Sequence, residues 1–299
     1  MQILRLNFPK IIRKYGLLLI TVATSFCTYA QERSDEDIDL LLDEMFFNEQ
    51  QFLDEMMLAG ISQDFLYTSL TYNSNTFFSG RDTGVDQFNM IPQMTYFHKS
   101  GFNATLSGIY YESFDPKWDF TSLSLAYFNT IGASNSLFYN LGYTRYFFTG
   151  DAGSFTNSLD LSVGITNKKR SLGTTLAGSY LFGDSNSFQL VSNSFLSFDL
   201  QRTATSAVRF RPNVSLVVAQ QTISFIRPQL VNGQPQLVLF SYDVFDLLNT
   251  QVNFPISLTS KSWDFELGYT LNLPNAVTTE SNLPTTGFVS FSVGYMFGL

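Results

Sequence analysis

From about residue 64 to the end of the chain, large apolar side chains recur at every second position within segments of about ten to fourteen residues. In KSWDFELGYTLN, residues 261–272, tryptophan, phenylalanine, leucine, tyrosine and leucine alternate with acidic residues, glycine, threonine and asparagine. A period of two is that of a β-strand whose two faces meet unlike surroundings. The pattern predicts twelve strands, at residues 65–77, 88–98, 102–112, 118–129, 136–148, 154–166, 171–182, 187–199, 207–219, 248–259, 262–273 and 286–298.

Such strands occur both in soluble sandwiches, which bury the apolar face, and in transmembrane barrels, which turn that face to lipid. The segment lengths lie near the ~9–11 residues that a tilted strand needs to cross a bilayer. Tyrosine and phenylalanine gather near strand ends, as in YNLGYTRYFF at residues 139–148, which is typical of aromatic girdles. We therefore predict an all-β fold for residues 64–299: an antiparallel up-and-down transmembrane barrel of about twelve strands, with fourteen as the alternative.

The connections between these strands alternate in kind. Every second one is short and mostly basic, as in HKSG (98–101) and NKKRS (167–171). The others are longer and richer in Asp, Gly and Pro, and they include the two extended stretches 220–247 and 274–286. Short turns on one side and long loops on the other are typical of outer-membrane barrels, with the short side periplasmic. An even strand number then places both termini in the periplasm.

Residues 1–30 have the pattern of a secretory signal peptide. Four basic residues precede the apolar run YGLLLITVATSFCTYA, which is shorter than the ~20 residues of a membrane-spanning helix. We expect cleavage after Ala30. Cleavage removes Cys27, the only cysteine, and leaves 13 basic against 25 acidic residues, a net charge of −12. Nucleic acid is therefore not an expected partner.

Residues 31–63 predict an acidic amphipathic helix on the periplasmic side. Within 34–60, apolar residues such as Leu41, Met45 and Phe52 recur at three- and four-residue steps, and Gly60 is a natural stop. Residues 31–60 hold ten acidic residues and one arginine. Three roles stay open: a helix capping the barrel, a docking element for a periplasmic partner, or a plug in the mouth of the barrel.

The chain closes on FVSFSVGYMFGL, with aromatic or apolar residues at alternate positions up to its last residue: Phe291, Val293, Tyr295, Phe297 and Leu299. This resembles the C-terminal signal that outer-membrane β-barrel proteins present to the bacterial insertion machinery, although that family most often ends in Phe. The pattern NSNTFFSGRDTG…IPQMTYFHKSGF is similar to uncharacterised barrel proteins of the Bacteroidota. The resemblance implies residence in the bacterial outer membrane, with outer-membrane lipid and the barrel-assembly machinery as partners, and it implies no activity.

Candidate functional residues lie where the alternation turns charge inward: Asp160, Asp199, Arg209, Arg211, Asp264 and Glu266. Opposed charges across a pore tune its ion selectivity. Inward ion pairs can equally fill a narrow barrel, and twelve strands fall between filled eight-stranded barrels and open porins. Two functions stay open: a passive channel for small polar solutes, or a closed structural or adhesive barrel that engages a partner through residues 220–247 or the helix 34–60.

Residues 220–247 contain Asn232-Gly233, the preferred two-residue hairpin turn. We expect an extracellular hairpin that continues the neighbouring strands. Its apolar content suggests that it folds over the mouth of the barrel or binds a partner. Two further membrane strands are the alternative.

No enzyme, metal site or cofactor is indicated. His98 is the only histidine, and HKS has the His-x-Ser spacing of the lipid A 3-O-deacylase, with Glu112 following. The predicted strand 102–112 rises by ~3.3 Å per residue and puts Glu112 roughly 40 Å from His98, beyond hydrogen-bond reach. An outer-membrane lipid hydrolase is therefore a distant third function. The mature chain lacks cysteine and a second histidine, and shows no close-spaced Asp loop for a metal.

Overall fold

The structure is a computed structural model of the 299-residue chain. It describes residues 63–82, 86–113, 116–132, 135–149, 155–231, 234–277, 280 and 283–299. Only the backbone is described at 78, 82, 119, 221–231 and 234–243. The predicted signal peptide (1–30) and nearly all of the predicted acidic segment (31–63) lie outside the described residues. No helix in the described part of the chain is long and apolar enough to cross a membrane.

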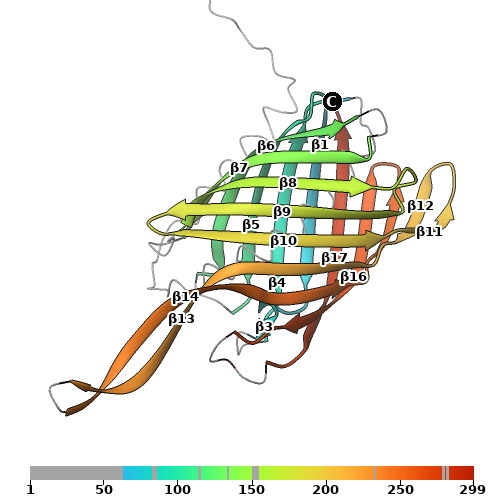
Figure 1. Ribbon diagram of the computed structural model, residues 1–299. Coiled ribbons are helices and arrows are strands. Elements are labelled where there is room, and N and C mark those ends of the chain that lie inside the picture. The colour runs from blue at the N-terminus through green and yellow to red at the C-terminus, as the bar shows by residue number, and fades with distance from the viewer. Residues whose placement is uncertain are drawn as a thin grey trace, which may run out of the picture.

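The described chain is a closed antiparallel β-barrel (Figure 1). Its strands are β1 (Phe65–Asn73), β4 (Asn89–Phe97), β5 (Phe102–Tyr111), β6 (Trp118–Ile131), β7 (Leu137–Phe148), β8 (Phe155–Thr166), β9 (Leu172–Gly183), β10 (Asn186–Leu196), β11 (Phe198–Arg202), β12 (Ser206–Phe210), β13 (Asn213–Val231), β14 (Gln234–Asn253), β15 (Ile256–Ser260), β16 (Trp263–Pro274) and β17 (Thr286–Gly298). A small hairpin, β2 (Phe77–Phe78) with β3 (Arg81–Asp82), lies in the first long connection.

Three strands of the barrel are each broken into two pieces, β10 with β11, β12 with β13, and β14 with β15. Counted whole, the barrel has twelve strands, so the predicted fold and strand number are confirmed. Two breaks contain Pro212 and Pro255, which have no amide hydrogen to donate to the ladder. Backbone hydrogen bonds still link the breaks: the Leu196 amide donates to the Pro212 carbonyl at 3.0 Å, and the Arg211 amide to the Pro255 carbonyl at 3.1 Å. The breaks therefore lie side by side and bend three neighbouring strands at one level.

The barrel closes where the first strand meets the last. The β1–β17 ladder runs from Phe65 opposite Gly298 to Asn73 opposite Ser290, and the Leu299 amide donates to the Asp64 carbonyl at 3.2 Å. Both ends of the described chain therefore lie at one rim, which we call the terminal-side rim. The long connections gather at the opposite rim, which we call the long-loop rim. Pairing leaves no open strand edge at the seam, a requirement for any sheet that faces lipid.

The two faces of the barrel wall differ sharply in chemistry. On β8, Leu159, Leu161 and Ile165 are 51, 51 and 59% exposed, whereas Ser158 and Ser162 are 0 and 4% exposed. The same holds for β16, where Leu267 and Tyr269 are exposed and Thr270 is buried. Apolar side chains thus cover the outside and polar ones the inside, the reverse of a soluble protein and the arrangement of a membrane-spanning barrel.

Residues 220–247 form the outer parts of β13 and β14, joined at 232–233. Beyond Ala219 and Asn249 these two strands pair with each other, whereas their ladders to β10 and β16 stop there. The predicted hairpin is confirmed, and the alternative of fourteen strands is wrong. Figure 1 shows the hairpin projecting away from the barrel body, so the prediction that it folds over the mouth is also wrong. We call it the hairpin arm.

Candidate functional site: the barrel interior

The candidate site is the inner wall, which changes in chemistry from rim to rim. Side chains at every second position of each strand point to it, as the alternation predicts. Three levels can be distinguished. The level toward the long-loop rim is largely apolar on β4 to β9, and the level at mid-height is polar. The level toward the terminal-side rim is charged across β12, β15 and β16 and aromatic on β1, β4, β6 and β7.

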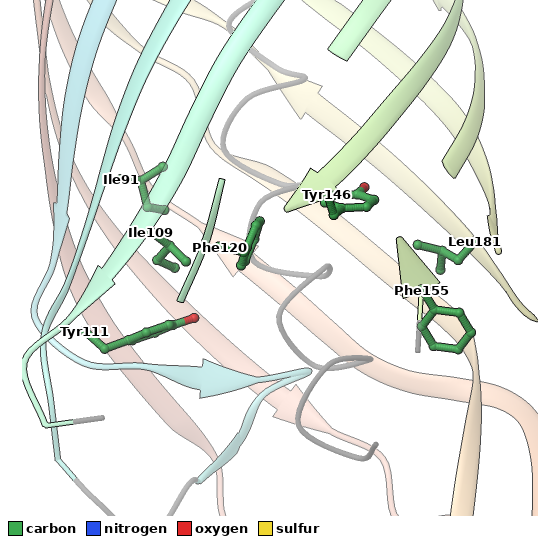
Figure 2. Packing of buried hydrophobic residues seen from close by; sticks show 7 residues of the cluster. All are labelled: Ile91, Ile109, Tyr111, Phe120, Tyr146, Phe155 and Leu181. Atoms are coloured by element: carbon green, nitrogen blue, oxygen red, sulfur yellow. The ribbon is translucent and has the colours of Figure 1, made fainter. Parts of the chain in front are cut away.

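Toward the long-loop rim the inner wall is apolar on β4 to β9, whereas Asn73, Asn249 and Asn272 are buried at this level on β1, β14 and β16. Seven residues that are 0–9% exposed form a cluster, with Phe148 packed against it. The Phe120 ring centroid lies 6.0 Å from that of Tyr146 and 5.5 Å from that of Phe148. The seven come from six neighbouring strands, β4 to β9, and point into the barrel (Figure 2). We call them the inner apolar belt: Ile91, Ile109, Tyr111, Phe120, Tyr146, Phe155 and Leu181.

At mid-height the wall is built of hydroxyl and amide side chains around one carboxylate, Asp160. Its Oδ1 accepts a hydrogen bond from the Ser179 hydroxyl at 2.7 Å. Its Oδ2 accepts bonds from Ser158 at 2.8 Å and Thr144 at 3.3 Å. Further polar pairs, such as Asn193 donating to the Ser215 hydroxyl at 2.7 Å, continue around the wall. These donors stabilise the inward carboxylate, because hydrogen bonds to an ionised acceptor are stronger than those between neutral groups.

Toward the terminal-side rim lie four of the other five candidates: Arg209 on β12, Arg211 in the break after it, and Asp264 and Glu266 on β16. Arg209 on β12 and Glu266 on β16 each pair with Ser257 of β15, so their side chains share the inner face. Asp264 accepts a hydrogen bond from Thr259 at 2.8 Å. The Arg211 guanidinium lies 3.7 Å from the centroid of the Phe195 ring. Acidic and basic groups therefore meet in one sector, while Asp160 on β8 lies apart from them.

The last candidate, Asp199, lies on β11 at the edge of the terminal-side rim. Its side chain is 46% exposed and pairs with Arg209 at 3.2 Å and Arg202 at 3.4 Å. The sequence predicted a continuous strand 187–199, but the break at Ser197 places Asp199 in the bent extension beyond it. It thus lies at the mouth of the interior rather than within it.

At the long-loop rim, the first long connection folds across the inside of the barrel mouth. It starts from β1, yet Gly80 reaches Asn249 on β14, past β17 and β16. A Cβ at Gly80 would lie 2.7 Å from the Asn249 side chain, and the φ of +76° is one that glycine adopts at no steric cost. The Thr286 hydroxyl of β17 donates to the Gly80 carbonyl at 2.9 Å. The connection therefore narrows the mouth.

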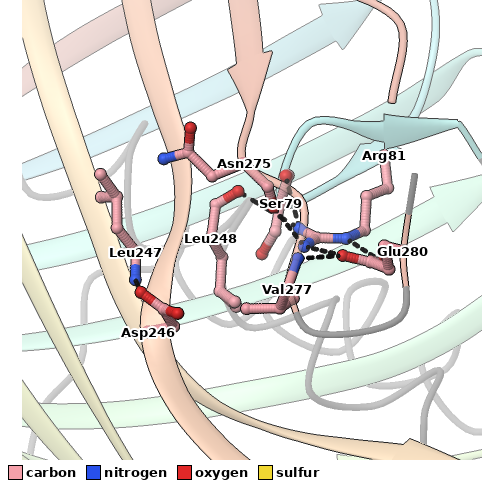
Figure 3. Close-up of polar contacts among 8 residues, drawn as sticks. All are labelled: Ser79, Arg81, Asp246, Leu247, Leu248, Asn275, Val277 and Glu280. Carbon is pink, nitrogen blue, oxygen red and sulfur yellow. Dashed lines mark hydrogen bonds and ion pairs between the residues drawn. The ribbon is translucent and has the colours of Figure 1, made fainter. Parts of the chain in front are cut away.

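Arg81 holds this connection in place (Figure 3). Its Nε and Nη2 each donate to the Glu280 carboxylate at 2.9 Å, and the same guanidinium donates to the carbonyls of Ser79, Leu248 and Asn275. Burial alone would raise the pKa of Glu280, but the hydrogen bonds from Arg81 and from the Val277 amide hold that pKa below its ordinary value. These contacts join the first long connection, between β1 and β4, to the last one, between β16 and β17. We call the Arg81–Glu280 pair the loop latch; sequence reasoning missed it because nothing local marks the two residues as partners.

His98 lies in the β4–β5 turn at the terminal-side rim. Its Nδ1 lies 2.7 Å from the Ser100 hydroxyl, and its Nε2 lies 3.9 Å from Asp64, whose pKa is lowered chiefly by a hydrogen bond from the Lys99 amide. Each backbone amide of the turn already donates a hydrogen bond: Lys99 to the Asp64 carboxylate, Ser100 to His98 Nδ1, and Gly101 to the His98 carbonyl. No backbone donor of this turn is left for an oxyanion.

Glu112 follows the far end of β5, at the opposite rim from His98. The constellation around His98 thus secures the turn to the barrel seam rather than forming a nucleophilic site. Among the described residues, no three His, Cys, Asp or Glu side chains converge in a way that could hold a metal ion.

No family model matches the chain, and a search of curated proteins found no match. Similar solved structures include the KdgM porin, 9% identical with a TM-score of 0.46, covering 78% of this chain and 99% of that chain. The translocator domain of autotransporter NalP from Neisseria meningitidis is 10% identical with a TM-score of 0.45, covering 86% and 96%. LpxR from Salmonella typhimurium is 8% identical with a TM-score of 0.42, covering 78% and 100%. At these values the likeness carries no argument about what this chain does.

Proposed function

We propose that this chain is a bacterial outer-membrane β-barrel that lets small polar solutes pass passively. The observation that carries the proposal is the reversed sidedness of the wall: apolar side chains cover the outside, while hydroxyl and amide side chains line mid-height and a charged sector lies at the terminal-side mouth. Such a wall suits lipid outside and polar solutes inside. The predicted signal peptide and the C-terminal resemblance to an insertion signal support the proposal of export to the outer membrane, and we propose that both termini are periplasmic.

The charged sector near the terminal-side rim would set the ion preference of the channel. Arg209 and Arg211 lie beside Asp264 and Glu266 across β12, β15 and β16, so opposite charges meet over a short part of the wall. A field of this kind favours one sign of ion at the point where the solute must shed water. Removing the two arginines leaves the two carboxylates in excess and shifts preference toward cations.

Single-channel recording of residues 31–299 in a planar bilayer tests the proposal. We expect steady conductance, and we expect the double variant Arg209→Ala and Arg211→Ala to raise the cation-to-anion permeability ratio. Arg170→Ala, in an exposed turn at the same rim, is the matched control and should leave the ratio unchanged. Absence of channel current from protein shown to be folded, both with and without residues 31–60, would exclude a channel.

The hairpin arm favours a second candidate, a barrel that engages another protein. Beyond Ala219 the arm has two strands that pair only with each other. Isolated two-stranded hairpins are marginally stable in water, and their open edges are templates for strand addition. An arm that binds a partner would leave conductance unaffected when it is removed, and its removal would abolish binding at the cell surface.

A further inference from the structure

We propose that Arg145, on the outer wall of the barrel, binds the headgroup phosphate of a membrane lipid in the leaflet at the long-loop rim. Under the proposed orientation this is the outer leaflet. The inference goes beyond the proposed function, because a lipid on the outer wall neither requires nor prevents passage of a solute through the interior. It rests on the direction of the side chain, on the contacts that hold its guanidinium, and on the surface around it.

Arg145 lies on the outer face of β7, close to the end of that strand at the long-loop rim. Phe147, two residues further on and therefore on the same face, is 53% exposed. Thr144 and Tyr146, on either side of the arginine, are 8 and 9% exposed on the inner wall. Across the ladder, Arg145 pairs with Leu123 of β6, which is 42% exposed. An arginine thus lies on the face that the barrel turns to lipid.

The surroundings of Arg145 are those of a membrane interface. On β8, beside β7 (Figure 1), the outward residues from Leu159 to Ile165 are aliphatic, and Asn157, opposite Arg145, is the first polar one toward the long-loop rim. Exposed aromatic side chains lie on the same outer face of β7 and β9: Tyr143, Phe147 and Tyr180. Aromatic girdles mark the boundary between hydrocarbon and headgroups. An outward arginine is costly at the midplane of the bilayer but nearly neutral at this level.

Contacts with β8 fix one end of the Arg145 guanidinium. Its Nη1 donates hydrogen bonds to the Thr156 hydroxyl and to the Asn157 amide oxygen, both at 3.0 Å. The same amide oxygen accepts a hydrogen bond from the Tyr143 hydroxyl at 2.6 Å. The Asn157 amide nitrogen donates to a backbone carbonyl of β9 at 3.3 Å. Asn157 is therefore oriented from both sides, and it positions the guanidinium against the wall.

The other donors of Arg145 remain available for a ligand. None of the carboxylates in the described part of the chain lies within 4.0 Å of the guanidinium. The hydrogen bonds to β8 use Nη1, so Nε and Nη2 have no acceptor among the described residues. An arginine edge with two parallel N–H donors matches the oxygens of a phosphate. At a lipid-facing interface, the anion of that chemistry within reach is the phosphate of a headgroup.

The surface next to Arg145 favours a lipid over a soluble phosphate. Toward the middle of the wall, Leu125 on β6, Leu141 on β7 and Leu159 on β8 are 51–56% exposed on the outer face. Leu125 and Leu159 both pair with Tyr143, so these aliphatic side chains are neighbours across three strands. Acyl chains would lie along them while the phosphate stays at the level of the guanidinium. A soluble phosphate would gain nothing from this surface.

Retention of a phosphorylated lipid by the refolded barrel tests the site. Residues 31–299 in a neutral detergent are titrated with lipid A, a glycolipid that carries phosphate, and bound lipid is measured by native mass spectrometry. Arg145→Gln removes the charge and should weaken binding about tenfold, because a charge-assisted contact with the phosphate is lost. Arg170→Gln, in an exposed turn at the terminal-side rim, is the matched control and should bind as wild type does.

Two further ligands identify what the site recognises. Dephosphorylated lipid A with the same acyl chains should bind about tenfold more weakly to wild type and equally to Arg145→Gln. Equal retention of the two lipids by wild type, or equal retention of lipid A by wild type and folded Arg145→Gln, would overturn the proposal. Displacement of lipid A by millimolar inorganic phosphate at constant ionic strength would indicate a soluble anion as the ligand and would also overturn it.

A second variant keeps the test open should Arg145→Gln fail to fold. Asn157→Leu leaves the arginine in place but removes the group that orients it. It should weaken the retention of lipid A several-fold and leave that of the dephosphorylated lipid unchanged. Retention of lipid A as in wild type by this variant would contradict the assigned geometry. Channel recordings of both variants should match wild type, so that failure of the channel and failure of the lipid site are distinguishable.

Discussion

At the scale of single residues, long-range polar contacts give the barrel mouth its shape. Arg81 uses its guanidinium to bind one carboxylate and three carbonyls from three separate segments. The side chains of Arg81 and Glu280 are only 10 and 23% exposed. Removal of one member of such a pair lowers the stability of the folded protein, because the other member is left partly buried without its counter-charge.

Arg81→Met should therefore destabilise the barrel by about 2–4 kcal/mol. The loss should appear as a lower temperature for conversion of the folded to the unfolded band on a semi-native gel. It should also appear as faster proteolysis within residues 74–88. Arg170→Met in an exposed turn is the control. Equal stability of the two variants would show that the loop latch contributes nothing.

The loop latch also predicts a pH dependence. The pKa of Glu280 in the folded protein lies below its ordinary value of 4.5, so its stabilising effect is present above about that pH. The effect is lost as the pH falls through the lower pKa of the folded state. Wild-type protein should therefore lose more stability than Glu280→Gln between pH 5 and the acid limit. Parallel stability curves for the two proteins would contradict this.

Gly164 predicts a second effect at this scale. A Cβ there would clash with three atoms of the Phe138 ring, which is 1% exposed and stacks on Phe128. Gly164→Val should therefore cost about 1–3 kcal/mol through overpacking. Gly142→Ala, where the nearest atom is 3.4 Å away, should be tolerated. Denaturant titration of the refolded variants measures both, and a stable Gly164→Val would show that the ring moves freely.

At the scale of elements, β13 and β14 each have a part inside the barrel wall and a part outside it. Their inner parts pair with β10 and β16, and their outer parts pair only with each other. The stability of the barrel should not depend on residues 224–241, because their backbones pair only with each other and not with β10 or β16.

Replacement of residues 224–241 by a short Asn-Gly turn should therefore leave the barrel folded. The turn would join strands already in register, since Ile223 pairs with Tyr242. Circular dichroism and gel mobility should match wild type, with an unfolding midpoint within about 0.5 kcal/mol. An unfolded product would mean that the arm supports the wall in a way that strand pairing does not reveal.

At the scale of the whole molecule, the outer surface determines whether the barrel is stable in lipid or in water. Leu161 lies in the middle of β8 and Leu172 at the start of β9, and both point outward with 51 and 50% exposure. In lipid, the cost of an outward charge depends on depth, whereas in water it does not.

Leu161→Arg should cost about 2–4 kcal/mol of folding free energy in lipid vesicles, and Leu172→Arg about 0–1 kcal/mol. Denaturant unfolding from vesicles measures the difference. Nearly neutral effects of both substitutions would indicate that the outer wall faces water and would exclude a membrane barrel.

The sequence by itself determined the strands, their number and the two faces of the wall. The reason is physical: alternation has a period of two residues, so the sequence of a single strand is enough to assign each side chain to one face. On β8, for example, Leu159 is exposed on the outer face and Ser162 is buried on the inner one. The turn at 98–101 and the pairing of the two strands that flank Asn232-Gly233 were likewise predictable from local turn chemistry.

Only the tertiary structure decided what lies across the barrel. Arg81 and Glu280 are 199 residues apart, and nothing in either neighbourhood specifies the other. The three breaks at one level, the exposed position of Asp199 and the outward course of the hairpin arm depend on which strands become neighbours. Inner-wall chemistry follows the same rule: each member of the inner apolar belt is an ordinary strand residue, and closure of the sheet brings the seven together. Local periodicity determines which way a side chain points, while barrel closure determines what it meets.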